Sequence, residues 1–85
     1  MPPRITINRA DGELQIWLNP EGRDLLVRQL QSLSETNDHF HIMPEEMAPE
    51  LPSRNCAYQA GAEILEWGKV LFRPDEWDSR YYPTS

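Results

Sequence analysis

Apolar and polar residues alternate along most of residues 4–18, on both sides of the dipeptide Asp11-Gly12. Such alternation predicts two half-buried strands, and Asp-Gly suits a type I′ turn because both central residues of that turn need a positive φ. Counting outward from the turn pairs Ile7 with Ile16. We therefore expect a hairpin with one apolar face. The residues expected on that face are Ile5, Ile7, Leu14, Ile16 and Leu18.

A helix is predicted to follow the hairpin at once. Asn19 is a good N-cap, Pro20 suits the first helical position, and Glu21 favours the positive end of the helix dipole. Leucines then recur at helical spacing, which indicates an amphipathic helix packed on the apolar face of the hairpin. The helix is expected to end within residues 34–37. The leucines of the stripe are Leu25, Leu26, Leu30 and Leu33.

The second half of the chain is less regular. Residues 38–42 read as a short strand, with Phe40 and Ile42 on one face and His39 and His41 on the opposite face. Three prolines in residues 43–55 predict a loop, and residues 57–62 fit either a short strand or a helical turn. Residues 63–73 read as a last strand, in which Gly68 marks either a bulge or a close backbone approach, and an irregular tail follows.

These elements predict a single α+β domain over residues 1–85, because a chain of this length has room for one small core. The expected architecture is an antiparallel sheet of about four strands, in the order β-β-α-β-β, with the helix packed on one face. One cysteine, Cys56, cannot form an internal disulfide. The beginning of the chain has no apolar leader, and no run of about 20 apolar residues occurs, so we expect a cytoplasmic protein.

The formal net charge of −6 limits the kinds of partner that the protein is expected to bind. The excess is concentrated in residues 43–85, which hold eight acidic and four basic residues. A negative surface repels phosphate groups, so we expect neither nucleic-acid binding nor attachment to anionic membranes. The same charge would steer the protein toward a basic partner, although acidity also serves solubility alone.

Three constellations suggest chemistry, and each lacks a part. His39 and His41 share a strand face, but zinc needs three or four ligands, and Asp38, Cys56 or a loop glutamate would have to supply the others at no known spacing. We expect instead that both imidazoles make structural hydrogen bonds, or that one of them helps to hold a carboxylate of a partner. A Cys-His nucleophile pair lacks an orienting group and an oxyanion hole. The tail carboxylates lack a complementary base. We therefore expect no metal, no cofactor and no enzymatic activity.

Four segments together resemble the immunity protein 32 family of bacterial polymorphic toxin systems. They are residues 5–8 (ITIN), residues 19–30, residues 38–42 (DHFHI) and residues 70–78 (VLFRPDEWD). The resemblance implies an α+β fold, a gene beside a toxin gene, and neutralisation of that toxin by direct stoichiometric binding without catalysis. The alternatives are a generic interaction module or subunit with no toxin partner, and a metal-binding protein based on its histidines.

The partner-binding surface is predicted in the acidic and aromatic irregular segments. Carboxylates there would approach a basic toxin surface, prolines would stiffen the loop, and large aromatic side chains would anchor the contact. A homo-oligomer is also compatible with the sequence. Trp17 is expected either to cover a second small core beneath the tail or to contact a partner. The predicted binding residues are Glu45, Glu46, Glu50, Asp75, Glu76, Trp77, Asp78, Tyr81 and Tyr82.

Overall fold

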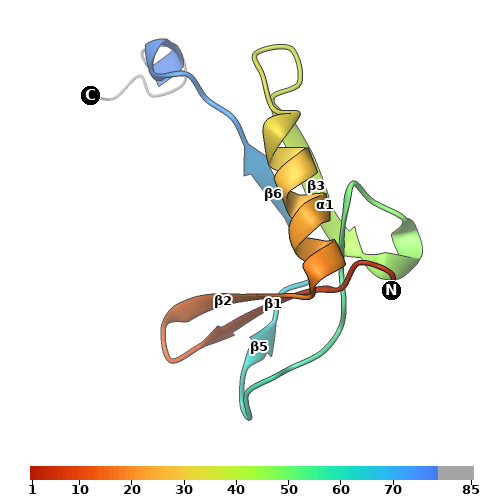
Figure 1. The fold of residues 1–85 in the computed structure, drawn as a ribbon. Helices are drawn as coiled ribbons and strands as arrows, with labels where there is room; N and C mark the ends of the chain where they lie inside the picture. Colours follow the sequence, from red (N-terminus) through yellow and green to blue (C-terminus); the bar gives the residue numbers. More distant parts are fainter. Residues whose placement is uncertain (79–85) are drawn as a thin grey trace.

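The computed structural model describes residues 1–78 and has one helix and two three-stranded sheets (Figure 1). The α+β class is therefore confirmed, but the single sheet of about four strands was wrong. The sheets have the strand orders β2-β1-β5 and β4-β3-β6. The elements are β1 (Ile5–Ala10), β2 (Glu13–Leu18), α1 (Pro20–Gln31), β3 (His39–Pro44), the 3-10 helix η1 (Glu45–Met47), β4 (Leu51–Ser53), β5 (Glu63–Ile64), β6 (Gly68–Leu71) and the 3-10 helix η2 (Asp75–Trp77).

The predicted hairpin is confirmed with its register. Asp11 and Gly12 have φ values of 55° and 76°, as a type I′ turn requires. Ile5 pairs with Leu18 and Ile7 pairs with Ile16. The turn chemistry of two residues thus determines which side chains of both strands face the core.

Hydrogen bonds join the start of α1 to Arg4, the residue immediately before β1. The side-chain Oδ1 of Asn19 accepts hydrogen bonds from the backbone N–H of Gly22 at 2.7 Å and of Arg4 at 2.8 Å. The backbone N–H of Asn19 donates in turn to the carbonyl of Arg4 at 3.2 Å. Gly22 allows this approach, because a Cβ at that position would lie within 3.0 Å of the Arg4 carbonyl oxygen. The helix ends at Gln31, earlier than expected.

The loop predicted over residues 43–55 contains two regular elements, so that prediction was wrong in part. The 3-10 helix η1 follows β3, and β4 then pairs with β3 in parallel, with Met43 beside Pro52. Proline is tolerated there because β4 is an edge strand, whose outward backbone N–H is not needed for pairing. A parallel neighbour of three residues leaves almost no periodic signal in the sequence.

The continuous strand predicted over residues 63–73 is divided between the two sheets. Residues 63–64 form β5 beside β1, whereas residues 68–71 form β6 beside β3. The intervening residues cross from one sheet to the other, and the backbone N–H of Leu65 donates to the carbonyl of Ile7 at 2.9 Å. This crossing connects the two sheets. Residues 57–62, expected to form a short strand or a helical turn, contain a turn at residues 58–61.

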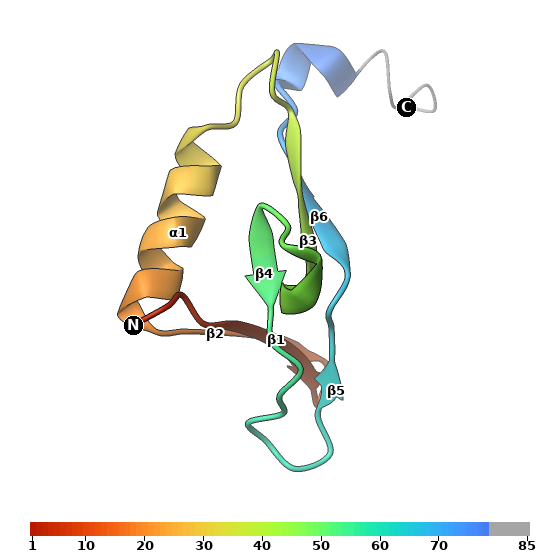
Figure 2. The same ribbon diagram turned by 90° about the vertical axis from the view of Figure 1, so that its right-hand side faces the viewer.

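The core lies where α1 and the second sheet stand as two layers on the hairpin (Figure 2). Its fully buried members are Ile5, Ile7, Phe40 and Leu51. Other hydrophobic residues surround them and are half-buried. These are Leu25, Leu26, Leu33, Ile42, Leu65 and Val70.

Strand β1 is buried on both faces, whereas β2 is not. Asn8 is completely buried on the face opposite the core, where its side-chain amide donates to the carbonyl of Cys56 at 2.9 Å and accepts from the N–H of Tyr58 at 3.1 Å. The ring of Trp17 packs on Tyr58 with centroids 5.1 Å apart, and Trp17 is still 42% exposed. Residues 79–85 of the tail that was expected to cover it lie outside the described part of the chain.

Leu25 and Leu26 of the predicted leucine stripe pack against the core from α1. Leu33 also packs there, but from beyond the end of the helix, whereas Leu30 is 47% exposed. The apolar face of β2 is also more open than predicted, because Leu14, Ile16 and Leu18 are all exposed. The helix and the second sheet meet above β1, so they do not reach across the whole hairpin. Within the described residues, no helix is long and apolar enough to cross a membrane.

Candidate protein-binding surface

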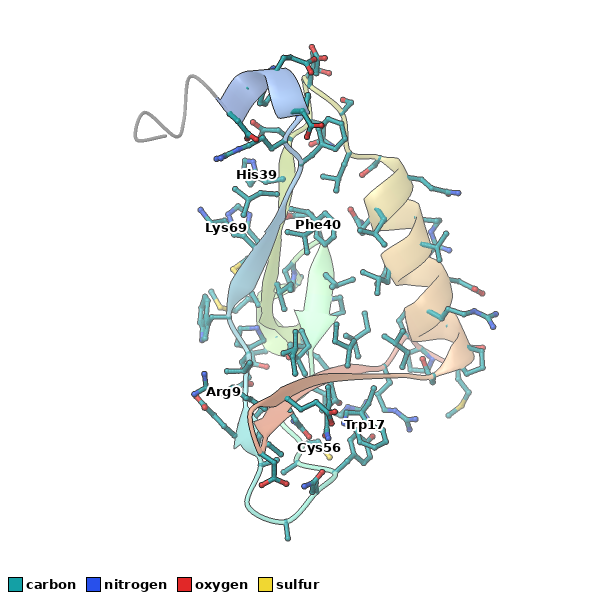
Figure 3. All side chains as sticks on the ribbon, turned by 90° about the vertical axis from the view of Figure 1, so that its left-hand side faces the viewer. Arg9, Trp17, His39, Phe40, Cys56 and Lys69 are labelled. Atoms are coloured by element: carbon teal, nitrogen blue, oxygen red, sulfur yellow. The ribbon has the colours of Figure 1, made fainter. Side chains whose placement is uncertain are left out.

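One face of the second sheet points away from the core and carries large exposed side chains. The pairing of β3 with β6 places His39 beside Leu71 and His41 beside Lys69, while Phe40 faces the core. In Figure 3, His39 and Lys69 point away from α1 and Phe40 points toward it. Trp67 precedes β6, and alternation puts it on the same side as Lys69. We call His39, His41, Trp67, Lys69 and Leu71 the outer face.

The outer face carries two large exposed apolar side chains beside its histidines and lysine. The side chains of Trp67 and Leu71 are 63% and 64% exposed, respectively. Single exposed apolar residues are ordinary on protein surfaces, but an exposed tryptophan on the same strand face as an exposed leucine offers a partner a large rigid contact area. This surface therefore fits a binding role better than a purely solvated one.

The two histidines are held by carboxylates at the edges of the outer face. The Nδ1 of His39 lies 2.8 Å from Oδ1 of Asp38, and the two imidazole rings meet edge to face with centroids 5.1 Å apart. The hydrogen bond with His39 lowers the pKa of Asp38 below its usual value. The expected structural hydrogen bond is thus confirmed for His39.

Glu50 supplies an acceptor to the backbone of β3. Its Oε1 accepts a hydrogen bond from the backbone N–H of His41 at 2.9 Å and lies 3.4 Å from the Nδ1 of the same residue. Strand β4 begins to pair with β3 only at Ile42, so the carboxylate of Glu50 takes the place of a further strand residue. The bond from the His41 backbone lowers the pKa of Glu50.

The predicted binding residues fall into two groups at opposite ends of β3. Glu45 and Glu46 lie in η1, which follows the end of β3, whereas η2 lies beside Asp38 at its beginning (Figure 1). The structure therefore does not join the two acidic groups into one patch. The outer face lies between them, and Glu50 borders it. The predicted residues Tyr81 and Tyr82 lie outside the described part of the chain.

Trp77 belongs to the acidic group near the beginning of β3 and lines a small pocket. Its neighbours there come from the end of β6 and from the residue before β3. The Nη1 of Arg73 also lies 3.9 Å from Oδ1 of Asp78, and Glu45 lies 3.6 Å from the Nε of Arg54 at the other end. Ion pairs this exposed contribute little to stability. The residues lining the pocket are Asp38, Leu71, Phe72, Arg73 and Trp77.

Sequence reasoning missed Lys69 and Leu71 as surface residues, and it noted Trp67 only as one of several aromatic side chains. Residues 67–71 show no clear alternation, because Trp67, Val70 and Leu71 are all apolar. The sequence also did not reveal that residues 68–71 pair with residues 39–42. The missing information was therefore the long-range pairing, which decides which of these side chains face outward.

Within the described residues, the structure gathers no set of candidate metal ligands and separates Cys56 from His39. Within residues 1–78, no group of three or more His, Cys, Asp and Glu side chains is close enough to hold a metal ion. Cys56 lies at the end of the molecule opposite His39, so these two residues do not form a nucleophile pair (Figure 3).

Comparisons of the chain with protein-family models, with curated proteins and with solved structures found no match. The resemblance to the immunity protein 32 family is therefore carried by the quoted segments alone.

Proposed function

We propose that the protein is an immunity protein that binds and neutralises a partner toxin, with the outer face as its main contact surface. The observation that supports this proposal is the exposure of Leu71, in β6, and of Trp67, the residue before β6. Aromatic side chains on a rigid element lose little conformational entropy when they bind, and such residues are enriched among the interface positions that dominate affinity.

Charge supports a basic partner. The chain has a net charge of −6, and acidic residues flank both ends of the outer face, with Glu45 and Glu46 at one end and Asp75 and Glu76 at the other. Such an arrangement accelerates encounter with a positively charged surface, and most of that acceleration is lost at high salt. Many toxins that attack nucleic acids present such a surface, because they must bind phosphate groups.

The test uses the toxin domain encoded beside this gene, assayed by growth protection on co-expression and by titration calorimetry. We expect a 1:1 complex, and we expect Trp67→Ala and Leu71→Lys to weaken it at least about tenfold. Val27→Lys is the matched control, because Val27 is 43% exposed on the opposite layer. The charge reversals Glu45/Glu46→Lys and Asp75/Glu76→Lys should chiefly slow association and reduce its salt dependence.

Two results would overturn the proposal. The first is a folded chain that neither binds the toxin nor protects cells from it. The second is protection that survives Trp67→Ala, Leu71→Lys and both charge reversals with unchanged affinity, because the contact surface would then lie elsewhere.

A further inference from the structure

Strand β2 is an open edge of the first sheet and lacks the features that usually protect such edges. It is six residues long, its sequence is ELQIWL, and its only charged residue is Glu13 at the end next to the turn. Exposed edges are normally shortened, charged or interrupted by proline, because their free backbone groups pair with other chains. The other edges described here follow that rule, since β5 has two residues, β4 contains Pro52 and β6 carries Lys69.

The backbone of β2 directs the hydrogen-bonding groups of alternate residues outward. The carbonyls of Ile5 and Ile7 accept from Arg54 at 2.8 Å and from Leu65 at 2.9 Å, so they point away from β2. Ile5 is opposite Leu18 and Ile7 is opposite Ile16, which makes both of these non-hydrogen-bonded pairs of the hairpin. The N–H and C=O groups of Ile16 and Leu18 therefore point outward, and by the same alternation so do those of Leu14.

The same three residues carry the exposed apolar side chains of the strand. Leu14 is 60% exposed, Ile16 is 50% exposed, and Leu18 is 37% exposed, all on one face of the sheet. Free backbone groups and uncovered apolar side chains thus coincide in Leu14, Ile16 and Leu18. Another strand that pairs with β2 would form hydrogen bonds with the free backbone groups and bury the apolar side chains at the same time.

We propose that the partner is a second copy of this chain, with the two β2 strands antiparallel about a two-fold axis at Ile16. The argument is self-complementarity: the apolar residues are spaced symmetrically about Ile16. Ile16 then faces Ile16 of the second copy, and Leu14 of each copy faces Leu18 of the other. In this register every outward N–H of the three residues meets an outward C=O, which gives the closed symmetry of an isologous dimer.

The pairing also avoids electrostatic conflict and leaves the outer face free. Glu13 lies opposite Asn19 of the second copy at the positive end of α1, and therefore does not face Glu13. The outer face belongs to the other sheet, so this proposal does not depend on the proposed function. Continuous pairing of β2 with its copy would join the two first sheets into one sheet across the dimer.

Sedimentation velocity over a range of about 5–500 µM tests the proposal, since a contact of this size is expected to dissociate at low concentration. We expect a reversible dimer for the native chain and a monomer for Ile16→Lys, which brings two lysines together on the axis. Leu71→Lys is the matched control and should remain dimeric, although the proposed function expects it to lose toxin binding. A native chain that is monomeric throughout the range, or a dimer that survives Ile16→Lys, overturns the proposal.

Amide hydrogen exchange by NMR keeps the test independent of any variant. The N–H groups of Leu14, Ile16 and Leu18 should exchange more slowly as the concentration of the native chain rises. The N–H of Trp17 belongs to the opposite alternation and should be protected at every concentration, because it is directed toward β1. A dimer in which the three outward amides exchange freely would show that the copies meet elsewhere.

Discussion

Replacement of Gly22 by alanine separates two physical effects that act in opposite directions. Gly22 lies in the first turn of α1, where alanine is favoured over glycine by about 1 kcal/mol through helix propensity alone. On that basis Gly22→Ala would stabilise the protein. The structure predicts the reverse, because the new Cβ would lie within 3.0 Å of the Arg4 carbonyl oxygen and at 3.0 Å from Oδ1 of Asn19.

The loss of stability expected for Gly22→Ala arises because Arg4 or Asn19 must move to make room for the new Cβ. Arg4 cannot shift without stretching its hydrogen bonds with Asn19, which measure 2.8 Å and 3.2 Å, and Asn19 is also the cap of the helix. Overpacking of this kind costs about 1–3 kcal/mol, and loss of an N-cap costs about 0.5–2 kcal/mol. Against the gain in propensity we expect a net loss of about 2 kcal/mol, which lowers the Tm by about 10 °C in a domain of this size.

Urea denaturation followed by tryptophan fluorescence measures the change, with Gly68→Ala as the control. A Cβ at Gly68 would meet Ile42 at 3.7 Å, an ordinary van der Waals distance, so this variant should differ from the parent by less than about 1 kcal/mol. If Gly22→Ala is as stable as the parent, or more stable, the tight fastening of α1 to Arg4 is refuted.

Three further substitutions test other parts of the fold. Asn8→Ala should cost about 2–3 kcal/mol in urea denaturation, because it leaves the Cys56 carbonyl and the Tyr58 amide without their buried partner; a loss below about 0.5 kcal/mol would show that water replaces it. Leu30→Ala should cost only about 1 kcal/mol, since Leu30 is half-exposed, and a loss above about 2.5 kcal/mol in the same assay would place it in the core. The pKa of Glu50 is lowered in the folded state, so the stability it adds is present above its usual value of 4.5 and disappears as the pH falls through the lower folded value. The difference in unfolding free energy between the parent and Glu50→Gln should therefore vanish at acidic pH, and a difference that instead grows on acidification would contradict the assignment.

Local rules were sufficient for the first half of the fold. The Asp11-Gly12 turn determined the hairpin register, and Asn19-Pro20 determined the start of the helix, because each depends on neighbouring residues only. The same rules failed for Pro52, which lies in a parallel edge strand. They failed again where the chain leaves β5 to join the other sheet, because that crossing depends on pairing with distant strands.

The candidate surface could be predicted only in part. Alternation placed His39 and His41 on the face opposite Phe40, and the structure agrees. The neighbours that make this face apolar, Trp67 and Leu71, became visible only with the pairing of β3 and β6. The acidic segments were identified from charge alone, and charge gave no information on their separation by the length of β3.

The buried amide of Asn8 has a consequence for how this protein can change over generations. It hydrogen-bonds residues 56–58 through their backbone groups, so these hydrogen bonds do not depend on the side chains of that segment. Mutations at Ala57, whose side chain faces solvent, can therefore accumulate without loosening the loop. The surface at this position can therefore diverge between related proteins while the backbone of the segment stays attached to β1.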